Sequence, residues 1–119
     1  NDSKTKNIVG KEDLFKRDYA ALVDKYLSME TKPVVIVALS PHAKSSGWTI
    51  SDERIRTIIN PIQRAVAEER GLTVVDTYTL FKDNATTIFY GDGIHPNEKG
   101  RKLLAEVFSA KLKELVPAK

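Results

Sequence analysis

The chain has 119 residues, of which 41% are hydrophobic and 29% are charged, as expected for a single globular domain. Its net charge of +3 comes from basic residues interspersed with acidic ones, which argues against nucleic acid as a partner. Its longest apolar run is far too short to span a membrane. The sequence has no cysteine, which excludes disulfides, thiolate metal sites and cysteine nucleophiles.

The first predicted elements are a helix and a buried strand. Apolar residues recur every three or four positions between residues 11 and 28, which predicts an amphipathic helix, and Glu12 and Asp13 lie in its first turn, where the helix dipole favours negative charge. The segment 34–39 that follows Pro33 is apolar on both faces. That pattern is typical of a central parallel strand covered on both sides.

A loop rich in serine, glycine and proline is predicted over 40–50, and it carries His42 and Trp48. We expect His42 to be a solvated loop histidine. For Trp48 two interpretations are equally open: the indole stacks on a sugar ring at the mouth of a pocket, or it covers the top of the helix that follows.

The second helix is predicted over 52–70. Ser51 is a suitable N-cap and Gly71 a suitable C-cap residue. Pro61 lies inside this helix and cannot donate a backbone hydrogen bond, so we expect a kink or a break near residues 57–60.

The remaining elements are a strand, a short helical turn and a long terminal helix. The segment 72–76 has the composition of a strand and ends at Asp76, which we expect to cap a helical turn over 77–82. A long loop then leads to Asn97, the predicted N-cap of a helix over 98–115. The order αβαβα predicts the α/β class with parallel strands.

Two strands are too few for three long amphipathic helices, because an isolated parallel pair has little surface to cover. The strand 34–39 would also keep one unpaired edge, which natural proteins avoid. We therefore expect this edge to pair with a second copy of the chain or with an N-terminal segment outside it.

The most informative motif is Asp92-Gly93-Ile94-His95-Pro96-Asn97. A spacing of three residues lets the Asp92 carboxylate accept a hydrogen bond from one imidazole nitrogen of His95, and it leaves the other nitrogen facing outward as a base. This is two-thirds of a catalytic triad, and the nucleophile is missing. Ser40 is the best-placed serine, but Pro41 prevents the sharp turn that a nucleophile needs, and we expect no such role for it or for Ser3, Ser45 and Ser46.

A metal centre is the weaker alternative. Imidazole and carboxylate groups suit zinc, and the chain offers His42, Asp76, Asp92 and His95. Because their spacing is irregular, the sequence favours an acid–base pair and predicts no metal ligands.

The motif around His95, together with Gly100, resembles the last sequence block of the SGNH hydrolase family, the GDSL-like lipases and acylhydrolases. Asn1-Asp2-Ser3 resembles the end of that family's third block, Gly-x-Asn-Asp, at a suitable distance. The chain is most similar to the carbohydrate-esterase branch, the sialate O-acetylesterase-like proteins, in Asn1-Asp2-Ser3-Lys4, the Trp48 loop followed by Asp52-Glu53-Arg54-Ile55, and the His-Pro-Asn turn.

This resemblance covers essentially the whole chain and implies a fold. The expected fold is a partial three-layer α/β/α domain with a flavodoxin-like parallel sheet, in which the strands 34–39 and 72–76 are the fourth and fifth. Residues 1–119 would then be the C-terminal part of a single hydrolase domain that lacks its N-terminal nucleophile block.

The resemblance also implies roles for individual residues. Asp92 would orient His95, which would act as general base toward a serine and then as general acid toward the leaving alkoxide. Asn1 would be the oxyanion-hole donor, although we expect it to be loosely held as a chain end. Trp48 is the candidate substrate-binding residue, and no cofactor is implied.

The expected function is that of a serine ester hydrolase that removes O-acetyl groups from carbohydrates through an acyl-enzyme, with this chain inactive alone. The expected partners are an acylated carbohydrate or another small ester, together with a second copy or an N-terminal segment, but no nucleic acid or membrane. A secreted or periplasmic location agrees with the resemblance. The alternatives are a non-catalytic α/β module that binds or assembles through its open sheet edge, and a metal-dependent hydrolase.

Overall fold

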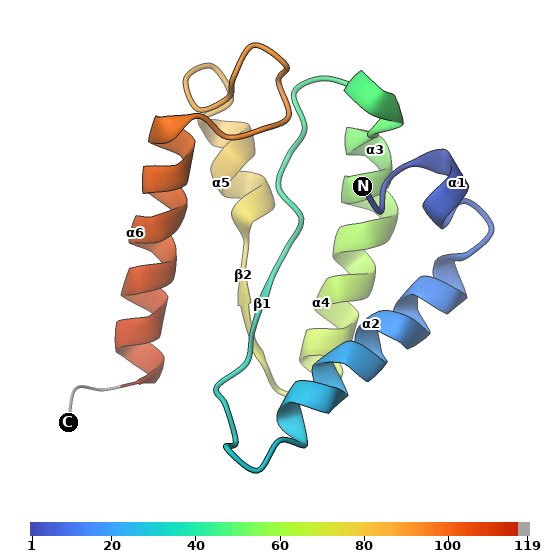
Figure 1. The fold of residues 1–119 in the computed structure, drawn as a ribbon, viewed down its shortest axis with the longest axis vertical. Helices are drawn as coiled ribbons and strands as arrows, with labels where there is room; N and C mark the ends of the chain where they lie inside the picture. The colour runs from blue at the N-terminus through green and yellow to red at the C-terminus, as the bar shows by residue number, and fades with distance from the viewer. Residues whose placement is uncertain (117–119) are drawn as a thin grey trace.

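The computed structural model describes residues 1–116 and has the predicted α/β architecture. Helices and strands alternate along the chain, and both strands run in the same direction (Figure 1). The helices are α1 (Thr5–Ile8), α2 (Glu12–Leu27), α3 (Asp52–Arg54), α4 (Asn60–Glu69), α5 (Thr77–Asp83) and α6 (Glu98–Leu115), and the strands are β1 (Ile36–Ala38) and β2 (Thr73–Val75).

The parallel pair is shorter than the sequence predicts. β1 and β2 pair from Ile36 with Thr73 to Ala38 with Val75, instead of over the full predicted segments. Within residues 1–116, β2 is the only ladder partner of β1, and Val34 is 55% exposed just before β1 begins. The outer edge of β1 is therefore open, as expected from the sequence.

Two side-chain amides from α4 close the end of β1. The Ser40 N–H donates to the side-chain oxygens of Asn60 (2.8 Å) and Gln63 (3.0 Å), and the Asn60 amide donates back to the Ser40 carbonyl (3.0 Å). Both amide side chains are buried. They occupy the backbone groups that a longer ladder would use, so the chain leaves the sheet at this point.

The helix predicted over 52–70 is continuous but not uniform. α3 passes into α4 through a π-helical turn, Ile55–Ile59, in which the Asn60 N–H bonds the Ile55 carbonyl five residues back. The prediction of an irregularity near 57–60 is confirmed, and its form is a wide turn. This turn places Pro61 at the start of α4, where its missing N–H is tolerated.

The predicted capping residues are confirmed. The side chains of Ser51, Asp76 and Asn97 each accept a backbone N–H three residues on, and Gly71 adopts a φ of +63° after α4. Two short elements are missing from the prediction, α1 and a 3-10 helix at Gly47–Thr49, because helices of three or four residues carry no periodic signal.

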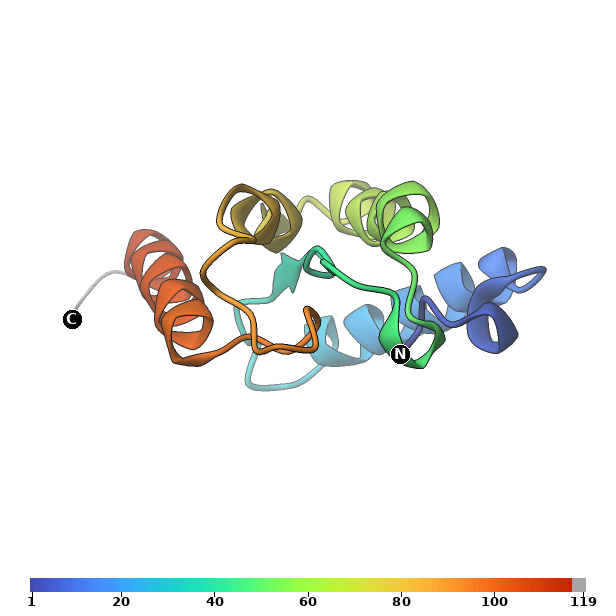
Figure 2. The ribbon, with the colours of Figure 1, turned by 90° about the horizontal axis from the view of Figure 1, so that it is seen from above.

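Helices cover the strands on two sides. Seen from above, α4 and α5 lie on one side of β1 and β2, the C-terminal half of α2 lies on the other, and α6 stands at the edge beside α5 (Figure 2). The largest fully buried side chains come from both strand and helix: Phe81, Ile8, Ile59, Val37 and Val66.

The molecule is a thin slab with apolar surface left uncovered. It measures 41 × 35 × 18 Å, and its radius of gyration of 15.2 Å exceeds the value of about 14 Å expected for a compact domain of this length. Exposed apolar side chains lie on α2, before β1 and near the end of α6: Leu14, Leu22, Tyr26, Val34 and Leu112. Residues 1–116 thus leave part of the predicted three-layer interior open.

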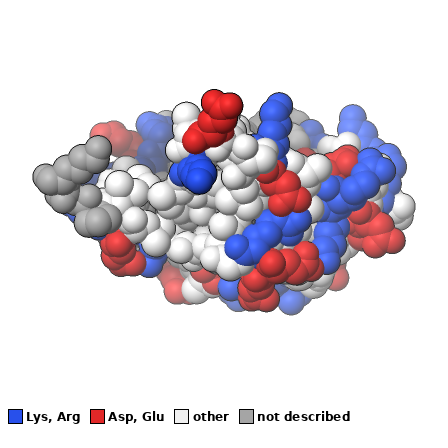
Figure 3. All heavy atoms as spheres, turned by 90° about the horizontal axis from the view of Figure 1, so that it is seen from below, with Lys and Arg blue, Asp and Glu red and all other residues white. Residues whose placement is uncertain are grey.

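Charged groups of both signs are mixed on the surface. Figure 3 shows the molecule of Figure 1 from below, where Lys and Arg lie beside Asp and Glu. Two of the ion pairs join α2 to the end of α4, Lys16 with Glu69 (2.8 Å) and Asp24 with Arg70 (2.6 Å). No helix within residues 1–116 is both long and apolar enough to cross a membrane.

Candidate active site

The candidate site lies at the carboxyl end of the two parallel strands. Two loops meet there, residues 39–51 after β1 and residues 84–97 between α5 and α6, and the N-terminus lies beside them (Figure 1). In open α/β sheets this is the end where ligands bind.

The turn Asp92–His95 has the predicted geometry. One carboxylate oxygen of Asp92 accepts the backbone N–H groups of Ile94 (2.8 Å) and His95 (2.9 Å), and the other lies 2.8 Å from His95 Nδ1. Gly93 adopts a φ of +67°, and a Cβ there would lie 3.1 Å from the Ser45 side chain. Glycine is therefore required at the point where the turn reverses.

These hydrogen bonds fix the protonation pattern of the pair. The backbone N–H of Ile94, the His95 ring and the His95 N–H lower the pKa of Asp92 to about 2, so its carboxylate is ionised at neutral pH and can only accept. His95 Nδ1 must then carry the proton that it donates, and in the neutral ring Nε2 has the free electron pair. The His95 side chain is 62% exposed, so this nitrogen is accessible to a reacting group.

The loop after β1 forms hydrogen bonds with the backbone of the turn. The Lys44 N–H donates to the Gly93 carbonyl (2.8 Å), and the Ser45 hydroxyl donates to the Asp92 carbonyl. On the other side, the Asn97 side chain caps α6 and also donates to the carbonyls of Thr87 (2.9 Å) and Phe89 (3.1 Å). Asp92 and His95 are thus held by hydrogen bonds on both sides of the turn.

Trp48 lies against the imidazole of His95. The two ring centres are 5.6 Å apart with planes inclined by 62°, and the indole is 62% exposed. Trp48 and Thr49 have φ values of +52° and +64°, a strained backbone for residues with side chains. A pocket of about 340 Å³ lies between Trp48, His95 and Asn1. The indole therefore forms a wall of this pocket.

Asn1 is tied down, contrary to the expectation of a loose chain end. Its carbonyl accepts the Lys4 N–H (3.1 Å) and the side-chain amide of Asn7 (2.8 Å). Asn1 also lines a second pocket of about 170 Å³, which adjoins the first and has Ile50 and Ile94 in common with it. Asn1 thus stands between the His95 pocket and the His42 pocket.

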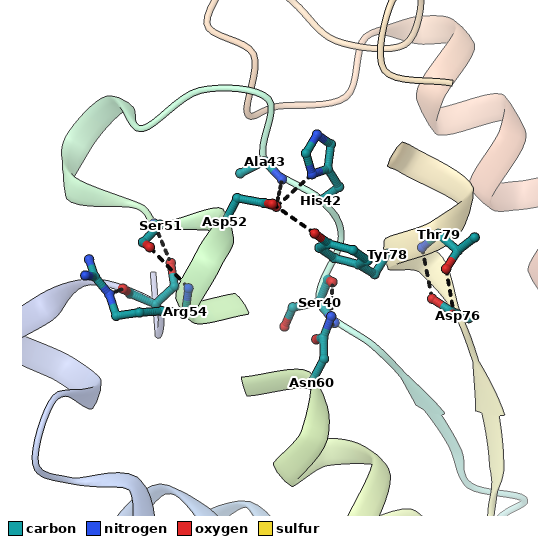
Figure 4. Close-up of polar contacts among 11 residues, drawn as sticks. Ser40, His42, Ala43, Ser51, Asp52, Arg54, Asn60, Asp76, Tyr78 and Thr79 are labelled. Carbon is teal, nitrogen blue, oxygen red and sulfur yellow. Dashed lines mark hydrogen bonds and ion pairs between the residues drawn. The ribbon is translucent and has the colours of Figure 1, made fainter. Parts of the chain in front are cut away.

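The prediction for His42 is wrong. Its side chain is only 17% exposed, and Nδ1 lies 2.7 Å from a carboxylate oxygen of Asp52 (Figure 4). Asp52 also accepts the Ala43 N–H (2.9 Å) and the Tyr78 hydroxyl (2.9 Å). Burial and the contact with the Asp52 carboxylate raise the pKa of Tyr78 to about 12. This cluster joins the loop after β1 to α3 and α5, and Ala43, Ile55 and Tyr78 pack together as an apolar core around it.

Three of the four serines considered from the sequence, Ser3, Ser40 and Ser45, have side chains that form hydrogen bonds elsewhere. Ser40 donates to Gln63 (3.3 Å), Ser45 to the Asp92 carbonyl, and Ser3 accepts the Ser51 N–H (3.1 Å). Within residues 1–116 no serine hydroxyl forms a hydrogen bond with His95.

The structure does not gather the four residues of the metal alternative. His42 pairs with Asp52, His95 pairs with Asp92, and Asp76 accepts the N–H and the hydroxyl of Thr79. In the described part of the chain no three histidine, aspartate or glutamate side chains are placed to share a metal ion.

Sequence reasoning missed Asp52, Tyr78 and Arg54. The sequence places Asp52 and Arg54 at the start of a predicted helix, in a segment that carries part of the family resemblance, and places Tyr78 in a short helical turn, but it predicts no site role for any of the three. Their partners lie between 5 and 51 residues away along the chain, so no local spacing reveals these contacts.

Comparisons with known proteins agree with the geometry. Residues 1–103 match the family model described as the GDSL-like lipase/acylhydrolase family. The chain is 37% identical over 81 residues to an acetylxylan esterase of Xylanibacter ruminicola, which covers 68% of this chain and 17% of that protein.

Two solved structures have the same fold. A lipase/acylhydrolase from Enterococcus faecalis superposes with a TM-score of 0.80 at 20% identity, over all of this chain and 60% of that one. The esterase domain of the ORF1 protein from the zebrafish ZfL2-1 retrotransposon superposes with a TM-score of 0.74 at 21% identity, over 87% of this chain and 60% of that one. The chain therefore spans less than two-thirds of each protein it resembles.

Proposed function

Because this chain belongs to the GDSL-like lipase/acylhydrolase family, we propose that it carries the acid–base pair and the oxyanion donor of a serine esterase that removes O-acetyl groups from carbohydrates. The observation that carries this proposal is the contact of 2.8 Å between Asp92 and His95 Nδ1, on a ring that is 62% exposed. A histidine oriented in this way by a carboxylate is the arrangement that activates a serine hydroxyl.

The proposed mechanism has two half-reactions. His95 Nε2 takes the proton of a serine hydroxyl while the serine oxygen bonds the acyl carbon, and the resulting imidazolium gives that proton to the departing sugar oxygen. Water then attacks the acyl-enzyme by the same route and releases acetate and the serine. Asp92 stabilises the imidazolium in both steps, and the Asn1 amide donates to the negative carbonyl oxygen.

Two observations favour a carbohydrate ester. The indole of Trp48 is exposed and lines the same pocket as His95 and Asn1, and an exposed aromatic face can stack on a sugar ring. The acetylxylan esterase that is 37% identical over 81 residues is named for an acetylated polysaccharide.

We infer that the nucleophile comes from outside these residues and that residues 1–119 form the C-terminal part of the hydrolase domain. The inference is supported by the engaged hydroxyls of Ser3, Ser40 and Ser45 and by the open edge of β1. The chain alone should then lack esterase activity.

An assay of aryl acetate hydrolysis tests the proposal. It compares the 119-residue chain with a nucleophile-bearing form, the same chain extended N-terminally to include a Gly-Asp-Ser segment. Only the extended form should be active, chelators should leave its activity unchanged, and His95→Ala should lower kcat by about 10⁴-fold. Activity that survives His95→Ala would refute the role of His95, and chelator-sensitive activity of the short chain would favour the metal alternative.

The open edge also supports a second candidate role in assembly. Val34 beside β1 and Leu14, Leu22 and Tyr26 on α2 present apolar surface, and unpaired strand edges favour association. We expect the 119-residue chain to self-associate, and the nucleophile-bearing form to do so less. Light scattering that finds a stable monomer of the short chain would exclude assembly through this edge.

A further inference from the structure

The N-terminal segment of the candidate site is held by one buried residue. Ser3 is only 3% exposed, although it lies two residues from the start of the chain. Its hydroxyl accepts the Ser51 N–H (3.1 Å), and its carbonyl accepts Arg54 Nε (2.6 Å). The two donors are the N-cap residue and a first-turn residue of the helix that follows the Trp48 loop.

Arg54 also contacts the segment that carries Trp48. While Nε bonds the Ser3 carbonyl, one terminal nitrogen of the guanidinium donates to the Thr49 carbonyl (3.3 Å). Thr49 follows Trp48, and both residues are in the left-handed backbone region. Residues with side chains rarely adopt this conformation, so surrounding contacts must hold it.

One planar guanidinium therefore joins two segments that face His95. Its nitrogens have fixed relative positions, so the Ser3 carbonyl and the Thr49 carbonyl are held at a fixed separation. Asn1 lies two residues before the first carbonyl, and Trp48 lies one residue before the second. The pocket between Asn1, Trp48 and His95 lies between these two segments.

We propose that Arg54 is a positioning residue that holds the Asn1 amide and the Trp48 indole at fixed positions relative to His95. This proposal rests on the proposed function, in which Asn1 acts as oxyanion donor. Arg54 does not line the pocket between Asn1, Trp48 and His95, so it does not contact the reacting atoms in this scheme. It acts through Asn1 and Trp48.

The expected effect is on kcat more than on KM. Removal of an oxyanion donor lowers kcat by about 10²–10³-fold, and a displaced donor should lose part of that. In the nucleophile-bearing form, Arg54→Gln should lower kcat for an aryl acetate by about 10–100-fold with little change in KM. Arg54→Lys should recover part of the loss, because one ammonium can bond one of the two carbonyls.

A double-mutant cycle separates positioning from general damage. If Arg54 acts through Asn1, the double variant Asn1→Ala/Arg54→Gln should have nearly the kcat of Asn1→Ala alone. Arg56→Gln is the matched control, because Arg56 lies on the same helix, is exposed, and forms no side-chain hydrogen bond within residues 1–116. It should leave kcat unchanged. Additive effects of Asn1→Ala and Arg54→Gln would overturn the proposal.

Hydrogen exchange tests the contact without any activity. The Ser51 amide in the 119-residue chain should exchange at least about tenfold faster in Arg54→Gln than in the parent or in Arg56→Gln, since Ser3 would be released. Unchanged exchange at Ser51 would overturn the proposal. If the Ser51 amide exchanges faster in Arg54→Gln but the nucleophile-bearing form has no esterase activity, the proposed function fails. The contact between Arg54 and Ser3 would still be supported.

Discussion

The two histidines of this chain each contact an aspartate through Nδ1, yet they belong to different kinds of environment. His95 lies 2.8 Å from Asp92 and is 62% exposed, whereas His42 lies 2.7 Å from Asp52 and is 17% exposed. Within residues 1–116 the carboxylate of Asp92 bonds only its own turn, through the N–H groups of Ile94 and His95 and the His95 ring. Asp52 instead bonds two other elements, through the Ala43 N–H and the Tyr78 hydroxyl.

The difference teaches that the contact between a histidine and an aspartate does not by itself identify a catalytic pair. Asp92 serves one imidazole, and that imidazole opens onto a pocket beside Trp48 and Asn1. Asp52 satisfies several buried donors at once, and so it joins the loop after β1 to α3 and α5. The first pair is available for chemistry, and the second stabilises the wall of the neighbouring pocket.

The same substitution at the two aspartates should separate these roles most strongly. In the nucleophile-bearing form, Asp92→Asn should lower kcat for an aryl acetate by about 10⁴-fold, because an amide no longer holds the imidazole in the required tautomer. Asp52→Asn should change kcat by only a few-fold. Steady-state kinetics of both variants gives the answer, and equal losses of kcat would end the distinction between the pairs.

The two pairs should also respond to opposite ends of the pH scale. The pKa of Asp92 is lowered to about 2, mainly by the Ile94 N–H, so the stability that its turn gains from ionisation is present above about pH 4 and is lost as pH falls toward 2. Burial raises the pKa of Tyr78 to about 12, so the stability gained from its neutral hydroxyl is present below about pH 10 and is lost as pH rises toward 12.

NMR can follow these titrations residue by residue. The Ile94 amide signal should shift as pH falls toward 2, and the Tyr78 ring signals should shift as pH rises toward 12. Tyr78 ring signals that shift near pH 10, the ordinary value for tyrosine, would mean that burial and Asp52 do not keep the hydroxyl neutral.

Loss of the Asp52 side chain should destabilise the fold. Asp52→Ala leaves the Ala43 N–H, the Tyr78 hydroxyl and His42 without their acceptor, and each unsatisfied buried group costs about 1–3 kcal/mol. Because the side chains are partly exposed to water, we expect a loss of about 2 kcal/mol in the free energy of unfolding, measured by urea denaturation. Asp92→Ala should cost less, and the reverse order would contradict the structural role of Asp52.

The smallest expected effect concerns the aromatic neighbours of the two rings. Trp48 beside His95 is exposed, whereas Tyr78 beside His42 is buried. In the nucleophile-bearing form, Trp48→Ala should raise KM for acetylated xylo-oligosaccharides by about 3–10-fold, since stacking contributes about 1 kcal/mol, and should leave KM for a small aryl acetate nearly unchanged. An equal rise in KM for both substrates would show that Trp48 does not recognise the sugar.

The sequence predicts those parts of the molecule that are determined within one helical turn. The Asp92–His95 contact and the caps at Ser51, Asp76 and Asn97 each join residues three positions apart, so they follow from local spacing. The parallel strands follow from composition, but their ends do not, because Asn60 and Gln63 interrupt the ladder from another element.

The rest of the site depends on contacts between distant segments. Asp52 meets Tyr78 across 26 residues, and Arg54 meets Ser3 across 51. A histidine in a polar loop is therefore predicted as solvated, whereas the packing of three elements buries His42. The tertiary fold, which local patterns do not encode, decides which histidine remains accessible.

The π-helical turn at Ile55–Ile59 has a consequence for how this fold tolerates insertions and deletions. It contains one residue more than an α-helical turn would, and each residue rotates a helix by about 100°. Shortening the segment by one position would let the helix wind regularly, but it would swing the amides of Asn60 and Gln63 away from Ser40. The extra residue thus sets the rotation of α4 about its axis, so that Asn60 and Gln63 face the end of β1. A homologue without this residue would need different side chains to terminate the strand.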